Sequence, residues 1–217
     1  IDMNNAGKIA KESAISFSGM GLGQIFRYLF TTLLARWAGV ELLGIYSIAN
    51  AVTRIFEVVG KLGLDQGVLR AVSRAKNQTD KQSVIFSALK MGLISSMIFM
   101  LVQIVIADWL STHIFHQTSL LTMVITIHAL SLPLYILIHI SAFSTQAYKI
   151  LKHKIFVSEI QNPLILLLAM VVFYFSFSAE SAIMLPVVIS SVFGVMTISI
   201  SLRKVTGVSL LYLMGGK

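Results

Sequence analysis

Six long apolar stretches dominate this chain of 217 residues. They cover residues 14–37, 42–60, 84–107, 120–147, 155–177 and 182–202. Each has about the 20 residues that an α-helix needs to cross the hydrocarbon core of a bilayer, whereas a β-barrel would show alternating segments of about 10 residues. Only 12% of the residues are charged, against about 25% in soluble domains. The sequence therefore predicts an all-α fold, a polytopic transmembrane helical bundle of about six spans.

Basic residues gather in alternate loops of this bundle. They precede the first span, separate the second from the third and the fourth from the fifth, and follow the sixth: Lys8, Lys11, Lys61, Arg70, Arg74, Lys76, Lys81, Lys149, Lys152, Lys154, Arg203 and Lys204. By the positive-inside rule we expect a multi-pass protein of the cytoplasmic (inner) membrane, with both ends of this segment in the cytoplasm. This distribution accounts for the net charge of +8, so we expect no nucleic-acid partner.

The ends of the chain suggest one part of a larger protein. We expect residues 1–204 to form an N-terminal six-helix transmembrane lobe and residues 205–217 to begin a linker or a truncated next span. The chain opens with Ile1 and closes soon after a short apolar run, which is typical of a fragment. The first apolar run is too long for a cleavable signal peptide.

Five charged residues lie inside or at the edges of the apolar stretches: Arg27, Arg54, Glu57, Lys90 and Glu159. A charge in hydrocarbon is costly, so such residues usually face a bundle interior or a watery cavity and serve a substrate or ion pathway. Arg27 lies midway along its span, too deep to reach either surface by snorkelling. It is the strongest candidate for contact with a substrate.

The other four charges have structural alternatives. Arg54 and Glu57 are three residues apart, so they form either a structural ion pair or, for Arg54, part of an anion site. Lys90 lies about two turns from the basic loop, within snorkelling distance. Glu159 is interfacial or, with Pro163 breaking the helix beyond it, part of a site that couples a proton or cation.

Helical spacing collects polar residues on one face of each span. These cavity-lining candidates include Tyr46, Asn50, His128 and His139. A bundle that turns these faces inward would enclose a hydrated cavity of net positive charge. Histidines relay protons near neutral pH, but a lone histidine in a span is more often a packing residue. Gly19 and Gly23, four residues apart, favour close packing of two helices.

The sequence contains no constellation typical of catalysis. His113 and His116 have a metal-like spacing but no carboxylate or thiol near them, and the chain has no cysteine. We therefore expect no enzymatic activity, no metal and no cofactor, although a membrane enzyme built from unrecognised residues is an alternative.

Residues 33–74 resemble a known family. They read LLARWAGVELLGIYSIANAVTRIFEVVGKLGLDQGVLRAVSR, and the similarity rests on LLAR at the end of the first span, LLGIYS at the start of the second and GLDQGVLRAVSR after it. Gly39 in the short outer turn also matches, and the positions that matter most are Gly44, Tyr46, Gly63, Leu64 and Arg70. This pattern resembles the polysaccharide-biosynthesis flippases, the Wzx-like branch of the MOP exporter superfamily, which also contains the MurJ-like flippases and the MATE exporters.

The resemblance implies two six-helix lobes around a cavity that faces each side of the membrane in turn, of which this chain would supply the first. It implies a substrate of the undecaprenyl- or dolichyl-diphosphate-linked oligosaccharide type, exported for surface polysaccharide, with membrane lipid and polysaccharide polymerases or glycosyltransferases as further partners. We expect Arg27, Arg54 and Lys90 to bind the anionic diphosphate, and Glu57 and Glu159 to couple an ion or form structural ion pairs.

Two alternatives follow from the same residues. A MATE-like exporter of cationic drugs requires acidic rather than basic cavity residues. A membrane subunit of an envelope-polysaccharide pathway that does not itself transport requires no substrate site.

Overall fold

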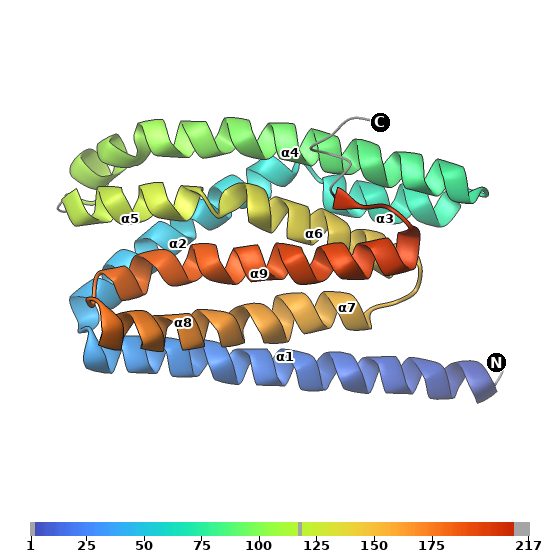
Figure 1. Cartoon of the computed structure of the whole chain (residues 1–217), viewed down its shortest axis with the longest axis horizontal. Coiled ribbons are helices and arrows are strands. Elements are labelled where there is room, and N and C mark those ends of the chain that lie inside the picture. Colours follow the sequence, from blue (N-terminus) through green and yellow to red (C-terminus); the bar gives the residue numbers. More distant parts are fainter. Residues whose placement is uncertain (1–2, 117–118, 211–217) are drawn as a thin grey trace.

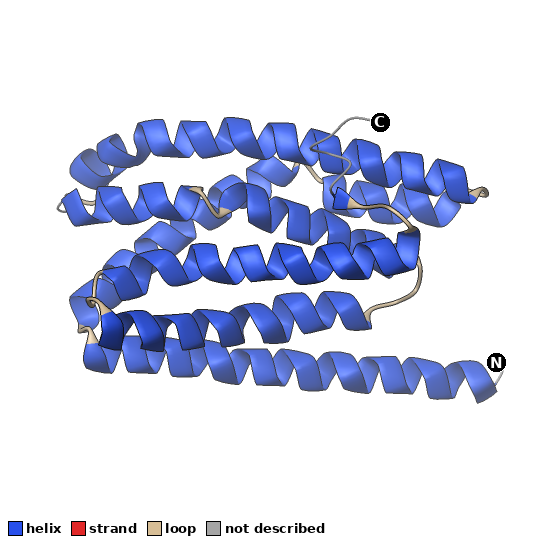
Figure 2. Ribbon diagram, viewed as in Figure 1, coloured by secondary structure: helices blue, strands red, loops and turns tan. Residues whose placement is uncertain are grey.

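The computed structural model describes residues 3–116 and 119–210, with side chains from residue 16 onward. This part of the chain is helical and contains no strand (Figures 1 and 2). Its helices are α1 (Met3–Trp37), α2 (Val40–Lys61), α3 (Leu64–Arg74), α4 (Gln78–Trp109), η1 (Leu110–Ile114), α5 (Ser119–Ala129), α6 (Leu132–Ala147), α7 (Lys152–Ile155), η2 (Phe156–Gln161), α8 (Asn162–Ser176) and α9 (Ser181–Thr206). Of the predicted linker at 205–217, residues 211–217 lie outside the described part of the chain, and α9 extends to Thr206.

Five helical segments within the described residues are long and apolar enough to cross a membrane. They are Val40–Arg74, Gln78–Ile114, Ser119–Ala147, Lys152–Ser176 and Ser181–Thr206. The first predicted span falls within α1, which has 35 residues but is not one of the five. Its glycines, serines and Arg27 reduce its hydropathy. The predicted all-α polytopic bundle is confirmed.

The basic segment between the second and third spans, treated as a loop in the sequence, contains the helix α3. Two consecutive left-handed residues, Leu62 (φ 50°) and Gly63 (φ 71°), separate it from α2. Glycine adopts this conformation freely, whereas leucine does so at a steric cost. Val68 and Val72, one turn apart, are buried against α4 and α6, which holds α3 in place.

Prolines interrupt two of the three spans that contain one. Pro133 cannot donate a hydrogen bond to the preceding turn, and the chain changes direction between α5 and α6 through tight bonds from Leu130 and Ser131 to carbonyls three residues earlier. Pro163 follows the π-helix η2. In contrast, α9 continues as one helix through Pro186.

Three clusters of buried apolar side chains join the helices. One includes Phe30, Ile125 and Ile183, and another, near α3, includes Ile85 and Ile136. A third, smaller cluster includes Ile138, Val157 and Ile198. Polar groups also tie helices together. Gln103 Nε2 donates to Thr53 Oγ1 (2.8 Å) and to the Ile125 carbonyl (3.2 Å), which links α4 to α2 and α5.

The bundle has two ends of different charge. The turn between α3 and α4 lies at one end and the turn between α8 and α9 at the other (Figure 1). The predicted topology puts the first end in the cytoplasm.

Because the chain lacks cysteine, single cysteines test this topology directly. A membrane-impermeant maleimide added to intact cells should label Glu180→Cys, but should label Lys76→Cys only after permeabilisation. The reverse pattern would contradict the topology.

Candidate functional site

A polar cavity of about 310 Å³ lies between α1, α2, α5, α6, η2, α8 and α9. Its polar lining consists of Arg27, Thr31, Tyr46, Asn50, Thr53, Arg54, Glu57, His128, Tyr135, His139, Ser158, Glu159, Asn162 and Ser190. Eight of the nine residues proposed from the sequence therefore meet at one place. Thr53 and Ser158 were missed, because one hydroxyl on a mostly apolar helix gives no distinctive pattern.

Lys90 is the predicted site residue that does not line this cavity. It lies on α4 and is exposed, whereas the buried stripe of that helix runs through Ile85, Leu89, Gly92 and Ser96. This buried stripe faces α2 and α6, so Lys90 lies outside the cavity. Its predicted contact with the substrate does not come from this cavity.

Arg27 and Glu159 form an ion pair across the cavity wall. The Arg27 Nη2 donates to Glu159 Oε2 at 3.0 Å, joining α1 to η2. The two side chains are 38% and 28% exposed, so both still face the open space. The two opposite charges neutralise each other, and both side chains remain accessible to a competing ion.

Glu57 pairs with Lys61 and His139 rather than with Arg54. Its Oε1 lies 3.0 Å from Lys61 Nζ and 3.1 Å from His139 Nε2. The spacing of four residues between Glu57 and Lys61 is one at which side chains meet on a helix, so the sequence carried a signal for this pair. Within the described residues, Arg54 forms neither an ion pair nor a hydrogen bond.

The cavity has a net positive charge, as the sequence predicts, but the excess is small. Counting Lys61, three cations meet two carboxylates when both histidines are neutral. The excess positive charge therefore resides on Arg54.

His128 combines packing with an unused polar group. Its Nε2 lies 2.9 Å from the Ile183 carbonyl oxygen, and its ring contacts Tyr46 edge-on at 5.7 Å between ring centres. Its Nδ1 is buried and has no hydrogen-bond partner. Ser158 Oγ and Asn162 Oδ1, at the same cavity, are also buried without partners. Buried polar atoms of this kind are usually satisfied by water or a ligand.

The contact between α1 and η2 depends on glycine. Pro163 has no amide hydrogen for the Glu159 carbonyl, its partner in a regular α-helix, and the helix widens to a π-turn just before this proline. That carbonyl abuts the Gly23 position so closely that a Cβ there would overlap it, and a Cβ at Gly19 would meet Ile155. The close packing expected from the two glycines is confirmed.

The fold and this cavity define a multi-pass helical membrane protein with a charged, polar site between its spans. The family model described as "Polysaccharide biosynthesis protein" matches residues 9–208, and the chain belongs to this family. No curated protein and no solved structure is significantly similar to the chain. Within the described residues, no group of three or more His, Cys, Asp or Glu side chains is placed to hold a metal ion.

The glycine contact gives a matched pair of variants. Gly23→Ala inserts a methyl group against the Glu159 carbonyl and should destabilise the protein by about 1–3 kcal/mol. Gly21→Ala has open space and should be neutral or stabilising by up to about 1 kcal/mol, because alanine favours helix. Thermal unfolding in detergent measures both effects. Equal midpoints for the two variants would contradict the close α1–η2 packing.

Proposed function

We propose that this chain forms the N-terminal lobe of a flippase that moves a lipid-diphosphate-linked oligosaccharide across the cytoplasmic membrane by alternating access, for export of surface polysaccharide. The observation that carries the proposal is Arg54, a guanidinium that faces the cavity with no carboxylate partner among the described residues. An uncompensated charge at membrane depth is costly and is typically retained for function. The family of the chain, polysaccharide biosynthesis, is consistent with a sugar-linked substrate.

A diphosphate is the anion that best suits two arginines. A guanidinium offers a planar fork of donors that matches phosphate oxygens, and charge-assisted bonds of this kind are about twice as strong as neutral ones. Arg54 is available without rearrangement. Arg27 becomes available when its bond to Glu159 opens, so the substrate and Glu159 compete for one guanidinium.

This competition provides a way to couple transport to an ion. Protonation of Glu159, or binding of a cation to it, would release Arg27 for the diphosphate, and loss of that ion would restore the ion pair and expel the substrate. The unpartnered oxygens of Ser158 and Asn162 beside Glu159 supply further ligands for such an ion. Glu57 is a second candidate for this role through His139.

A MATE-like exporter of cationic compounds is less well supported. Both cavity carboxylates already have cationic partners, Glu159 with Arg27 and Glu57 with Lys61. A cationic drug would have to displace one of them while Arg54 repels it. A non-transporting pathway subunit, including one that serves a polymerase or a glycosyltransferase, would not need a charged cavity, and direct transport measurements separate it from a flippase.

Arg54→Gln should reduce flipping of a fluorescent lipid-diphosphate sugar by about tenfold or more in proteoliposomes, because hydrogen bonds to charged groups contribute about 1.5–3 kcal/mol. Arg74→Gln, which removes an exposed charge on α3 outside the cavity, should flip normally. Arg27→Ala should impair flipping too. Because this change leaves Glu159 unpaired, the Arg27→Ala/Glu159→Ala double variant is needed to measure the loss of the arginine alone. A folded Arg54→Gln protein with full activity would contradict the anion site.

Glu159→Gln tests the coupling. The neutral side chain no longer holds Arg27 by charge, so we expect tighter binding of the lipid diphosphate and flipping that no longer responds to an imposed proton or sodium gradient. Glu180→Gln, in the exposed turn before α9, should leave both properties unchanged. If Glu159→Gln flips with unaltered dependence on the gradient, the coupling resides elsewhere.

A further inference from the structure

A groove of about 620 Å³ runs between α1 and the α7–η2 segment. It shares no residue with the polar cavity, although the same two helical segments form part of both walls. Gly19 lies in it, and the lack of a side chain at this position brings α1 close to Ile155. The groove therefore lies on a different face of the α1–η2 contact from Arg27 and Glu159.

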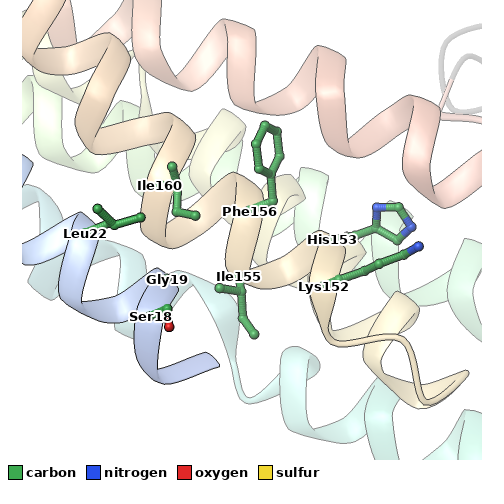
Figure 3. Close-up of a pocket in the computed structure, with 8 residues that line it drawn as sticks. All are labelled: Ser18, Gly19, Leu22, Lys152, His153, Ile155, Phe156 and Ile160. Carbon is green, nitrogen blue, oxygen red and sulfur yellow. The ribbon is translucent and has the colours of Figure 1, made fainter. Parts of the chain in front are cut away.

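The two ends of the groove differ chemically. Lys152 and His153 lie at one end, and Leu22 and Ile160 lie at the other (Figure 3). Phe156 lies between them and is 51% exposed, and Leu22 is 46% exposed. Large apolar side chains this exposed in a membrane-spanning helix usually face lipid. The groove thus has a cationic end and an open apolar part, the apolar trough, formed by Leu22, Phe156 and Ile160.

The depth of the groove in the bilayer fits this polarity. Lys152 is the first residue of the membrane-crossing segment Lys152–Ser176, so its charge lies at the level of the lipid headgroups. Ile160 is eight residues further on, about two helical turns deeper into the segment. A lipid with a phosphate at Lys152 would lay the first part of its chain against Phe156, Ile160 and Leu22.

We propose that this groove is the docking site at which the lipid carrier of the substrate enters from the cytoplasmic leaflet. Its phosphate contacts Lys152 and His153, and its hydrocarbon chain occupies the apolar trough. This inference rests on the proposed flippase function, and it adds where the substrate binds before it reaches the cavity.

The position of the groove favours the lipid carrier over an ordinary phospholipid. Arg27 is only five residues beyond Leu22 on α1, and Glu159 directly precedes Ile160 on η2. Between the groove and the cavity, α1 and η2 meet through glycine contacts and the Arg27–Glu159 ion pair. A diphosphate that binds Arg27 in place of Glu159 breaks this ion pair, the one ion pair between α1 and η2 among the described residues.

Photo-cross-linking tests the site directly. The full chain is reconstituted with a diazirine-bearing polyprenyl diphosphate, or in a parallel arm with a diazirine-bearing phosphatidylglycerol, and the labelled peptides are identified by mass spectrometry. We expect the polyprenyl probe to label residues 18–22 and 152–160. Equal labelling of these residues by phosphatidylglycerol would identify a general lipid contact and overturn the proposal, as would labelling elsewhere.

Matched variants define the two ends of the site. Lys152→Gln/His153→Gln should reduce this labelling about fivefold, because the charge of Lys152 near a membrane surface contributes about 1 kcal/mol to the binding of an anionic lipid. Leu22→Trp should reduce it to a similar extent by filling the trough from an exposed position. Lys76→Gln, an exposed cation between α3 and α4, should have no effect. Unchanged labelling in both groove variants would contradict the assignment.

Transport measured on the same proteins separates this proposal from the flippase proposal. Arg54→Gln should lose flipping and keep groove labelling. Groove labelling by an unmodified protein that does not flip would refute the flippase and leave the carrier site. Normal flipping with no label in the groove would refute the carrier site alone.

Discussion

The cost of an unpaired charge inside a bilayer governs the arrangement of this protein. Four charged residues that interrupt the apolar spans turn toward one cavity, and three of them acquire partners there. Arg27 bonds to Glu159 on a helix far away in the sequence, and Glu57 bonds to Lys61 and His139. Because the alternative is a charge in hydrocarbon, these contacts fix how α1, α2, α6 and η2 are rotated about their axes.

The contact between α1 and η2 joins backbone chemistry to the site. Pro163 has no amide hydrogen to donate to the Glu159 carbonyl, and the helix widens to a π-turn just before it. The Glu159 carbonyl packs against Gly23 of α1, where there is no side chain to block it. Such π-turns occur frequently at functional sites. Here the π-turn also carries the Glu159 side chain to Arg27, so one local irregularity sets both the packing and the ion pair.

In the proposed transport cycle, the same pair of helical segments serves two stages. Their lipid-facing side forms a groove with a cationic end, and their inner side carries the ion pair that competes with the substrate. Substrate binding and separation of α1 from η2 would then be one event, driven by exchange of a carboxylate for a diphosphate at Arg27.

Local sequence determined five of the six predicted spans and the all-α class, because about 20 apolar residues suffice to specify a crossing helix. It also placed Arg27, Arg54, Glu57 and Glu159 inside or at the edges of apolar stretches. It also favoured the close packing at Gly19 and Gly23. Only the tertiary structure decided that Arg27 meets Glu159, 132 residues away, that Arg54 stays unpaired and that Lys90 lies outside the cavity. The helix α3 likewise depended on burial of Val68 and Val72. Hydropathy fixes where a helix crosses the membrane, whereas its rotation and neighbours are set by packing between segments distant in the chain.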